Sequence, residues 1–207
     1  MSEGNGLRLY CNLMSEIKCR DQVIRSLLQG TTNTLYPMTN IESIYLQIRK
    51  ILELIALGSI VANKKEYSKQ HAKFQNHYNA KFILNDLKKI NPDFYPKPVK
   101  ETRSDQSGIA SQWQEYGGRA LSKDDFVKLY ERCGSLMHSQ NPYGKNKNIT
   151  FYKNNIEISL QKIVGLLNSH TVQLLSGNLY LIHMKKEGHD QVRGYIFAKV
   201  AQNTNQE

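Results

Sequence analysis

The chain has 207 residues, of which 40% are hydrophobic and 22% charged, and its formal net charge is +10. This length and composition predict a globular protein with a hydrophobic core and exclude wholesale disorder. The positive charge favours a polyanionic partner, with nucleic acid as the first candidate, although many small basic proteins are merely soluble.

The cysteine content predicts reduced thiols. Cys11, Cys19 and Cys133 form no CxxC pair, and their odd number argues against a disulfide framework. The N-terminus lacks the layout of a secretory signal, and no apolar run approaches the roughly 20 residues that span a bilayer. We therefore expect a cytoplasmic protein that has no membrane partner.

Hydrophobic spacing predicts three helices in the first part of the chain. The second of them is apolar on nearly all sides, which is typical of a central helix. Arg49 and Glu53 stand one turn apart on it, either as a surface ion pair or as a pair with a functional role. The expected ranges are 9–28, ended by Gly30; 41 to about 69, capped by Asn40; and 79–90, stopped by Asn91-Pro92.

Residues 93–121 contain several prolines and glycines and predict a long loop, which carries Arg119 and the single tryptophan, Trp113. Helices are then expected from Ser122 to about 138–140 and over 154–168. The last segment predicts a β-hairpin, because "NLYLIHMKK" and "QVRGYIFAKV" flank the short connection "EGHD". The predicted fold class is mainly α, with a helical bundle over 1–175 and a β-hairpin appendage and tail over 176–207.

Several kinds of site have no support in the sequence. The chain contains no GxxxxGK[ST], HExxH or paired CxxC motif, so we expect no nucleotide loop, no metal and no cofactor. "CGSLM" is not a nucleophile elbow, because the second glycine is missing and Ser135 would lie within a helix. Ser135 beside Glu131 and His138 is therefore not expected to form a hydrolase triad.

The stretch "RCGSLMHSQNP" carries the candidate chemistry, namely Arg132 and His138 at a helix end. Cleavage of RNA without a metal requires a base to activate the 2′-hydroxyl, an acid to protonate the leaving 5′-oxygen, and a fixed cation for the phosphorane. Histidine suits acid–base work near neutral pH. Arginine suits the phosphate because its planar fork donates two parallel hydrogen bonds.

The spacing of these two residues limits how they could act together. On an ideal helix, six residues correspond to about 120° of rotation and about 9 Å of rise, so the two side chains diverge. Either the last turn is distorted, which Gly134 and the following Pro142 would allow, or a second subunit completes the site. A two-fold axis would bring two copies of Arg132 and His138 together.

The Arg-x5-His pattern at the end of a helix, within a bundle built around a long apolar helix, resembles the HEPN superfamily. The likeness is greatest over "LYERCGSLMHSQNPY", and the helical layout extends it over much of residues 1–175. The resemblance implies a homodimeric, metal-independent endoribonuclease from a toxin–antitoxin or antiviral defence system. It implies phosphate-binding and acid–base roles for Arg132 and His138, and a cognate antitoxin or defence partner.

One position departs from the family pattern. Catalytic HEPN proteins commonly have a polar residue directly after the arginine, whereas this chain has Cys133, which falls on the apolar stripe of its helix. The alternative interpretation is therefore a non-catalytic HEPN-like module that binds RNA or a protein. Independently of the resemblance, Glu53 could orient Arg132 if their helices pack together, and Arg49 and Glu131 are further supporting candidates.

Basic residues near the motif are candidates for RNA binding. Lysines would neutralise phosphates and neighbouring aromatic side chains could stack on unpaired bases, although solvated lysines beside core aromatics would look the same. A basic DNA-binding regulator is a third class, but no helix-turn-helix pair fits it. The candidate RNA-binding residues are Lys145, Lys147 and Lys153, directly after the motif, and Lys73 and Lys81 before it.

Overall fold

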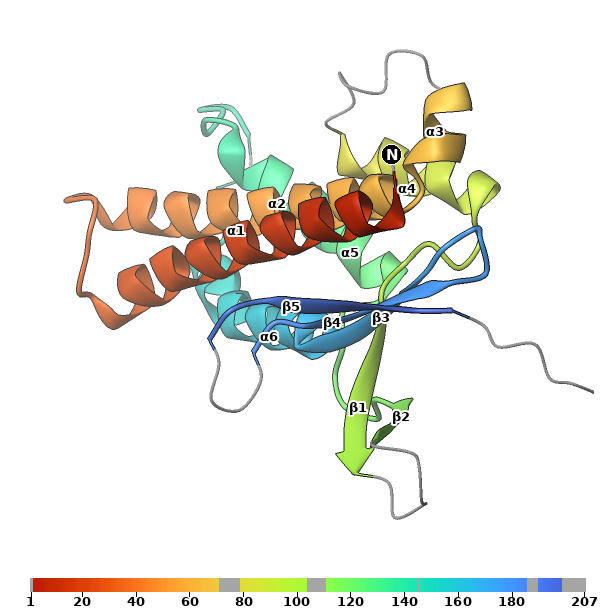
Figure 1. Ribbon diagram of the computed structural model, residues 1–207. Helices are drawn as coiled ribbons and strands as arrows, with labels where there is room; N and C mark the ends of the chain where they lie inside the picture. Colours follow the sequence, from red (N-terminus) through yellow and green to blue (C-terminus); the bar gives the residue numbers. More distant parts are fainter. Residues whose placement is uncertain (1, 71–78, 104–110, 145, 186–189, 199–207) are drawn as a thin grey trace, which may run out of the picture.

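The computed structural model describes residues 2–70, 79–103, 111–144, 146–185 and 190–198, and it is mainly helical with one antiparallel sheet (Figure 1). This confirms the predicted mainly α class. The helices are α1 (Glu3–Gln29), α2 (Pro37–Ala62), α3 (Lys64–Gln70), α4 (Ala80–Ile90), α5 (Lys123–Met137) and α6 (Ile149–Leu167). The strands are β1 (Lys97–Arg103), β2 (Ser111–Glu115), β3 (Ser169–Gln173), β4 (Leu179–His183) and β5 (Arg193–Phe197).

Helices α1 and α2 lie side by side and run in opposite directions (Figure 1). The expected end of the first helix is confirmed, because Gly30 adopts a left-handed φ of 74° and its N–H donates to the carbonyl of Leu27. The expected Asn40 cap of α2 is wrong. Pro37 occupies the first turn of α2, where a missing N–H costs nothing, and the Asn40 side chain accepts a hydrogen bond from Thr34 N instead.

Helix α2 is central, as its apolar character predicts, and contacts α1, α3, α4, α5, α6 and β3. It does not continue to residue 69, however, because the helix ends at Ala62 and α3 starts at Lys64. Buried Asn63 occupies the break. Its amide nitrogen donates to Ser59 O, and its Oδ1 accepts from Asn91 Nδ2 at 2.9 Å. The side-chain bonds at this position hold the chain in the bend.

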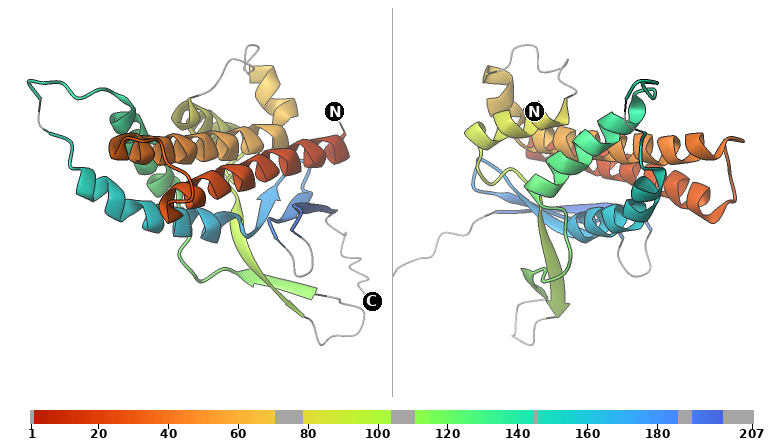
Figure 2. Two further views of the ribbon diagram at one scale, coloured as in Figure 1. Left: turned by 90° about the vertical axis from the view of Figure 1, so that its left-hand side faces the viewer. Right: turned by 180° about the vertical axis from the view of Figure 1, so that it is seen from behind.

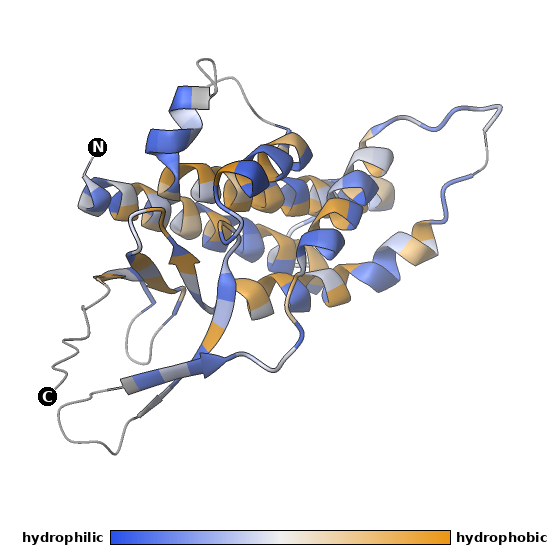
Figure 3. Cartoon of the chain, turned by 90° about the vertical axis from the view of Figure 1, so that its right-hand side faces the viewer, coloured by the Kyte–Doolittle hydropathy of each residue, from blue (hydrophilic) through white to orange (hydrophobic). Residues whose placement is uncertain are grey.

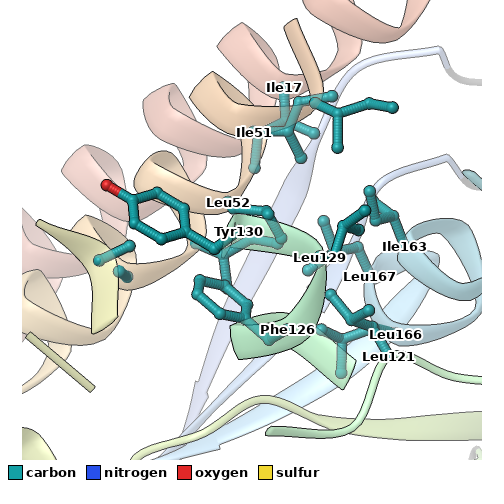
Figure 4. Packing of buried hydrophobic residues seen from close by; sticks show 14 of the residues in the cluster. Ile17, Ile51, Leu52, Leu121, Phe126, Leu129, Tyr130, Ile163, Leu166 and Leu167 are labelled. Atoms are coloured by element: carbon teal, nitrogen blue, oxygen red, sulfur yellow. The ribbon is translucent and has the colours of Figure 1, made fainter. Parts of the chain in front are cut away.

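The hydrophobic core lies where α1, α2, α5 and α6 meet. Figure 4 shows Ile17 of α1 and Ile51 and Leu52 of α2 facing α5 and α6. Each of these helices contributes buried apolar side chains to the core. The labelled core residues contributed by the later part of the chain are Leu121, Phe126, Leu129, Tyr130, Ile163, Leu166 and Leu167.

The sheet has the strand order β2-β1-β3-β4-β5. The expected C-terminal hairpin is confirmed, with Leu179 paired to Phe197 and His183 paired to Arg193 across β4 and β5. The expected loop over residues 93–121 is wrong, since it contains the hairpin of β1 and β2. β1 also pairs with β3, a strand that the sequence pattern does not predict.

The hairpin is part of this larger sheet, and the sheet joins the core. The boundary expected between residues 175 and 176 lies in the turn that joins β3 to β4, where Leu174 N donates to Asn178 O at 2.9 Å. Tyr180 and Ile182 of β4 are buried in the same cluster as the helices. β5 lies against α1.

Two parts of the chain project from the helices. The β1–β2 hairpin extends away from the body of the molecule, and Figure 3 shows that its outer part is mainly hydrophilic. The described residues of the α5–α6 connection also project outward (Figure 2). Among the described residues, no helix combines the length and hydrophobicity needed to cross a bilayer.

Candidate functional site

Helix α5 carries both residues of the candidate motif. Its start is as expected, because the Ser122 side chain accepts a hydrogen bond from Asp125 N at 3.1 Å. Its apolar face, which includes Phe126, Leu129 and Cys133, is buried. The helix ends at Met137, so Arg132 lies in its last turns and His138 is the first residue beyond it.

The Arg132 side chain points toward α6. Its guanidinium carbon lies 5.0 Å from the centre of the Phe151 ring, and its Nη1 donates to Asn155 Oδ1 at 3.4 Å. It also faces Tyr45 of α2, whose pKa burial raises to about 12 while the nearby guanidinium offsets part of that rise. The Tyr45 hydroxyl itself donates to Tyr152 O at 2.9 Å. Arg132 is therefore a half-buried cation held by aromatic and amide groups.

His138 lies in a different environment. Its backbone is extended, with φ −80° and ψ 141°, and its side chain is exposed. Lys147 Nζ donates to the carbonyls of Leu136 and His138 and so binds the free carbonyls at the end of α5. Within the described residues, the His138 ring makes no hydrogen bond.

Two of the supporting candidates, Arg49 and Glu53, form a second cluster where α2 packs on α5. Arg49 Nε lies 3.3 Å from Glu53 Oε1, and Lys50 Nζ lies 3.1 Å from Glu53 Oε2. Arg49 Nη2 donates to the Tyr130 hydroxyl at 2.7 Å. A Cβ on Gly134 would lie 3.2 Å from Arg49 Nη1, so the glycine leaves room for this approach. Glu53 thus pairs with cations of its own helix and not with Arg132.

Cys133 lies within reach of both arginines. Burial raises the pKa of its thiol to about 12, and the charges of Arg49 and Arg132 offset part of that rise. A thiol with this pKa stays protonated at neutral pH and is a poor nucleophile. Cys133 is therefore a buried residue of the hydrophobic core.

The remaining predicted residues are distributed over several surfaces. Glu131 forms an ion pair with Lys81 of α4, and Ser135 Oγ donates to the Glu131 carbonyl, so these residues form no triad with His138. Lys153 of α6 is exposed. Lys73 and Lys145 lie outside the described residues.

The sequence reading missed the residues that hold the two arginines, namely Tyr45, Tyr130, Phe151 and Asn155. Phe151 and Asn155 stand at i and i+4 on one face of α6, but α6 was expected to begin only at residue 154. An aromatic residue placed one turn before an amide was the available signal. Among the described residues, no group of three or more His, Cys, Asp or Glu side chains could hold a metal ion.

Comparisons with protein-family models, with characterised proteins and with solved structures found no match to this chain. Helix α5 itself shows what chemistry the site could carry out. On the side of the helix that faces α6, it places a half-buried guanidinium, which could bind a phosphate. It places an exposed imidazole, able to exchange protons, at the end of the same helix.

Proposed function

We propose that the protein is a metal-independent, HEPN-like endoribonuclease whose site forms between two subunits. The observation that carries this proposal is the position of Arg132. Its guanidinium rests on Phe151 and Asn155, at the same helix end from which His138 projects into solvent. A cation held in place before the substrate binds stabilises charge in the transition state without reorganisation.

The proposed reaction is cleavage by the neighbouring hydroxyl. The 2′-oxygen of the RNA attacks the adjacent phosphorus, which forms a 2′,3′-cyclic phosphate and breaks the bond to the 5′-oxygen. A histidine accepts the proton of the 2′-hydroxyl, and a protonated histidine donates one to the leaving 5′-oxygen. Arg132 binds the negative oxygens of the phosphorane through charge-assisted hydrogen bonds.

The need for both a base and an acid favours a dimer. One chain supplies a single motif histidine, His138, whose side chain is exposed. A two-fold axis beside the end of α5 would supply a second copy of His138 and of Arg132. The resemblance to HEPN proteins agrees with such a dimer and extends the proposal to a toxin or antiviral setting with a cognate partner.

RNA would approach along the surface that follows the motif. Phe151 is 44% exposed, so one face of its ring remains able to stack on an unpaired base while Arg132 covers another part. Lys153 lies two residues further along α6 and is exposed. Lys147 also follows the motif, but its amino group already binds carbonyls at the end of α5.

The test is cleavage of a mixed-sequence RNA in EDTA by the wild-type protein, Arg132→Ala and His138→Ala. We expect each substitution to reduce the rate by at least about a hundredfold, which is typical for loss of an acid–base or charge-stabilising group. The matched control is Arg8→Ala, because Arg8 is an exposed arginine on α1 whose side chain donates to Asn5 Oδ1. Equal cleavage by all four proteins would refute the proposal and identify a contaminating nuclease.

The subunit requirement has its own test. We expect the cleavage rate per chain to fall when the protein is diluted below the concentration at which sedimentation shows dimers dissociating. A monomeric form with full activity would contradict the composite site while leaving the assignment as a nuclease intact.

A second candidate function is a non-catalytic module that binds RNA or a protein. It is favoured by buried Cys133 directly after Arg132 and by the absence of a hydrogen bond on the His138 ring within the described residues. RNA binding without cleavage, weakened in Arg132→Ala and unchanged in His138→Ala, would support this module over the nuclease.

A further inference from the structure

A separate cavity lies between α6, the end of α1 and the segment that joins β2 to α5. Its volume is about 390 Å³, which is within the range of small-molecule sites. Val99, Leu160 and Val164 form an apolar part of its wall. The polar side chains that line it include Arg25, Tyr116, Arg119, Glu157 and Ser169.

The segment that supplies Tyr116 and Arg119 makes close contacts at two glycines, one on α6 and one within the segment. A Cβ on Gly165 of α6 would lie 1.9 Å from the backbone oxygen of Arg119, so only glycine allows this segment to lie against the helix. Leu121 N also donates to Lys162 O at 2.9 Å, and this hydrogen bond joins the same segment to α6. A Cβ on Gly118 would lie 2.3 Å from the Tyr116 ring, which therefore rests directly on that glycine.

Arg119 is placed at this cavity without a partner of its own. Its side chain is exposed, and in the part of the chain that the structure describes it makes no hydrogen bond, ion pair or ring contact. Arg25 also faces the cavity, and its Nε donates to Asp21 Oδ2 at 2.6 Å. The cavity thus offers one free guanidinium and the remaining donors of a second, which suits a phosphate.

The other polar groups suit a ligand that carries hydroxyl or amino groups on an apolar body. The Glu157 carboxylate is an acceptor at the cavity and lies 3.3 Å from Gln161 Nε2. Ser169 Oγ lies 2.9 Å from His183 Nδ1, so a hydrogen bond to a buried ring fixes the position of the serine side chain. The Tyr116 ring and the apolar wall could contact a planar group.

We propose that this cavity binds a nucleoside monophosphate. Arg119, with Arg25, binds the phosphate, Glu157 accepts hydrogen bonds from hydroxyl or amino groups, and Tyr116 contacts the base. This site is distinct from the Arg132 site and does not depend on the proposed nuclease activity. Its residues come from α1, β1, the β2–α5 segment, α6 and the start of β3, and they include none of the candidates on α5.

Calorimetric titration of the full chain with adenosine 5′-monophosphate and uridine 5′-monophosphate tests the site. We expect at least one nucleotide to bind, and to bind at least about tenfold more tightly than inorganic phosphate or the matching nucleoside. Arg119→Gln should weaken nucleotide binding by at least about tenfold, because the phosphate loses its charge-assisted hydrogen bonds to this guanidinium. It should leave binding of the nucleoside unchanged.

Two further variants make the result decisive. Arg8→Gln removes an exposed arginine far along α1 from this cavity and should leave binding unchanged. Arg132→Ala shows whether a nucleotide binds the proposed RNA site instead. Failure of both nucleotides to bind the wild-type protein would overturn the proposal. So would binding that is lost in Arg132→Ala but kept in Arg119→Gln, because the nucleotide would then occupy the RNA site. Phosphate binding as tight as nucleotide binding would reduce the site to one for free phosphate and would also overturn it.

Discussion

The Tyr10 hydroxyl and Nε2 of His170 lie 2.9 Å apart where α1 meets β3, and both side chains are fully buried. The other ring nitrogen of His170 lies 2.8 Å from the Leu167 carbonyl, which can only accept a hydrogen bond. Nδ1 therefore carries the proton, and Nε2 accepts from the Tyr10 hydroxyl. The neutral ring is satisfied at both nitrogens, which joins the first helix to the sheet.

This pair predicts that the protein loses stability in mild acid. Burial lowers the pKa of His170 from 6.5 to about 4. As the pH falls from about 6.5 to about 4, the unfolded chain takes up a proton that the folded chain does not, so the free energy of unfolding decreases. The expected loss is about 3 kcal/mol, because each unit of pKa difference corresponds to about 1.4 kcal/mol. Urea unfolding at pH 7, 6, 5 and 4.5 measures it.

His170→Asn shows whether this ring is the cause. Asparagine can still donate to the Leu167 carbonyl but does not titrate, so the unfolding free energy should depend less on pH over this range. The variant should also lose about 1–3 kcal/mol at pH 7, since the Tyr10 hydroxyl loses its acceptor. His138→Asn is the matched control, because it makes the same exchange at an exposed position away from the buried pair. An unchanged slope in His170→Asn would assign the effect elsewhere.

Gly165 predicts an unusual response to alanine in a helix. Alanine normally stabilises a helix interior by about 1 kcal/mol relative to glycine. At Gly165, however, a Cβ would lie 1.9 Å from the Arg119 backbone oxygen, and backbone cannot move as freely as the end of a side chain. We expect Gly165→Ala to lower the free energy of unfolding by about 2 kcal/mol or more.

The matched control for that variant is Gly4→Ala in α1. No atom lies within 4 Å of a Cβ at Gly4, so this substitution should be neutral or stabilise by about 0.5 kcal/mol. Urea midpoints of both variants give the comparison. Similar values for the two would show that the segment before α5 moves away from α6 at little cost.

The helices could be predicted largely from local sequence, whereas much of the sheet could not. Gly30 and Ser122 end and start helices through bonds to residues a few positions away, so their signals are present in the sequence. β1 pairs with β3 about 70 residues later, and prolines and charged residues conceal its strand pattern. The break at Asn63 depends on Asn91, which also lies far along the chain.

The candidate site likewise has features that local sequence predicts and features that depend on distant parts of the chain. Arg132 and His138 were identifiable because their residue types and spacing are local properties. The ideal-helix relation expected between them does not apply, because α5 ends at Met137 and the backbone of His138 is extended. The groups that hold Arg132 come from α2 and α6, and only the packing of three helices brings them together. The pairing of Glu53 with Arg49 was visible in the spacing, but its lack of contact with Arg132 was not.

Asn63 and Asn91 predict strong coupling between two buried amides. Asn91 Nδ2 donates to Asn63 Oδ1 at 2.9 Å and to Gln173 O at 3.0 Å, which links the α2–α3 break to β3. Asn63→Ala and Asn91→Ala should each destabilise by about 1–3 kcal/mol, because buried polar groups lose partners. The double variant should lose less than the two single losses combined, since the shared bond is removed only once.

A double-mutant cycle in urea measures this coupling, with Asn85→Ala on the exposed side of α4 as the control. The control should change the free energy of unfolding by less than about 0.5 kcal/mol. Additive losses from the two buried asparagines would show that their mutual hydrogen bond contributes nothing to stability.

Trp113 and Phe197 provide a direct report on the β1–β2 hairpin. Their ring centres lie 4.8 Å apart at an interplanar angle of 73°, which places β2 beside the end of β5 although the two strands are not neighbours in the sheet. Trp113 is the only tryptophan, so its fluorescence describes this contact alone. Phe197→Ala should shift its emission to longer wavelength and increase quenching by acrylamide, because the indole loses its cover. The loss in the free energy of unfolding should stay near 0.5–1.5 kcal/mol, about the value of one aromatic pair.

Phe82→Ala, which removes a 63% exposed ring on α4, should leave the emission unchanged. If Phe197→Ala also leaves it unchanged, the hairpin does not rest on β5 in solution.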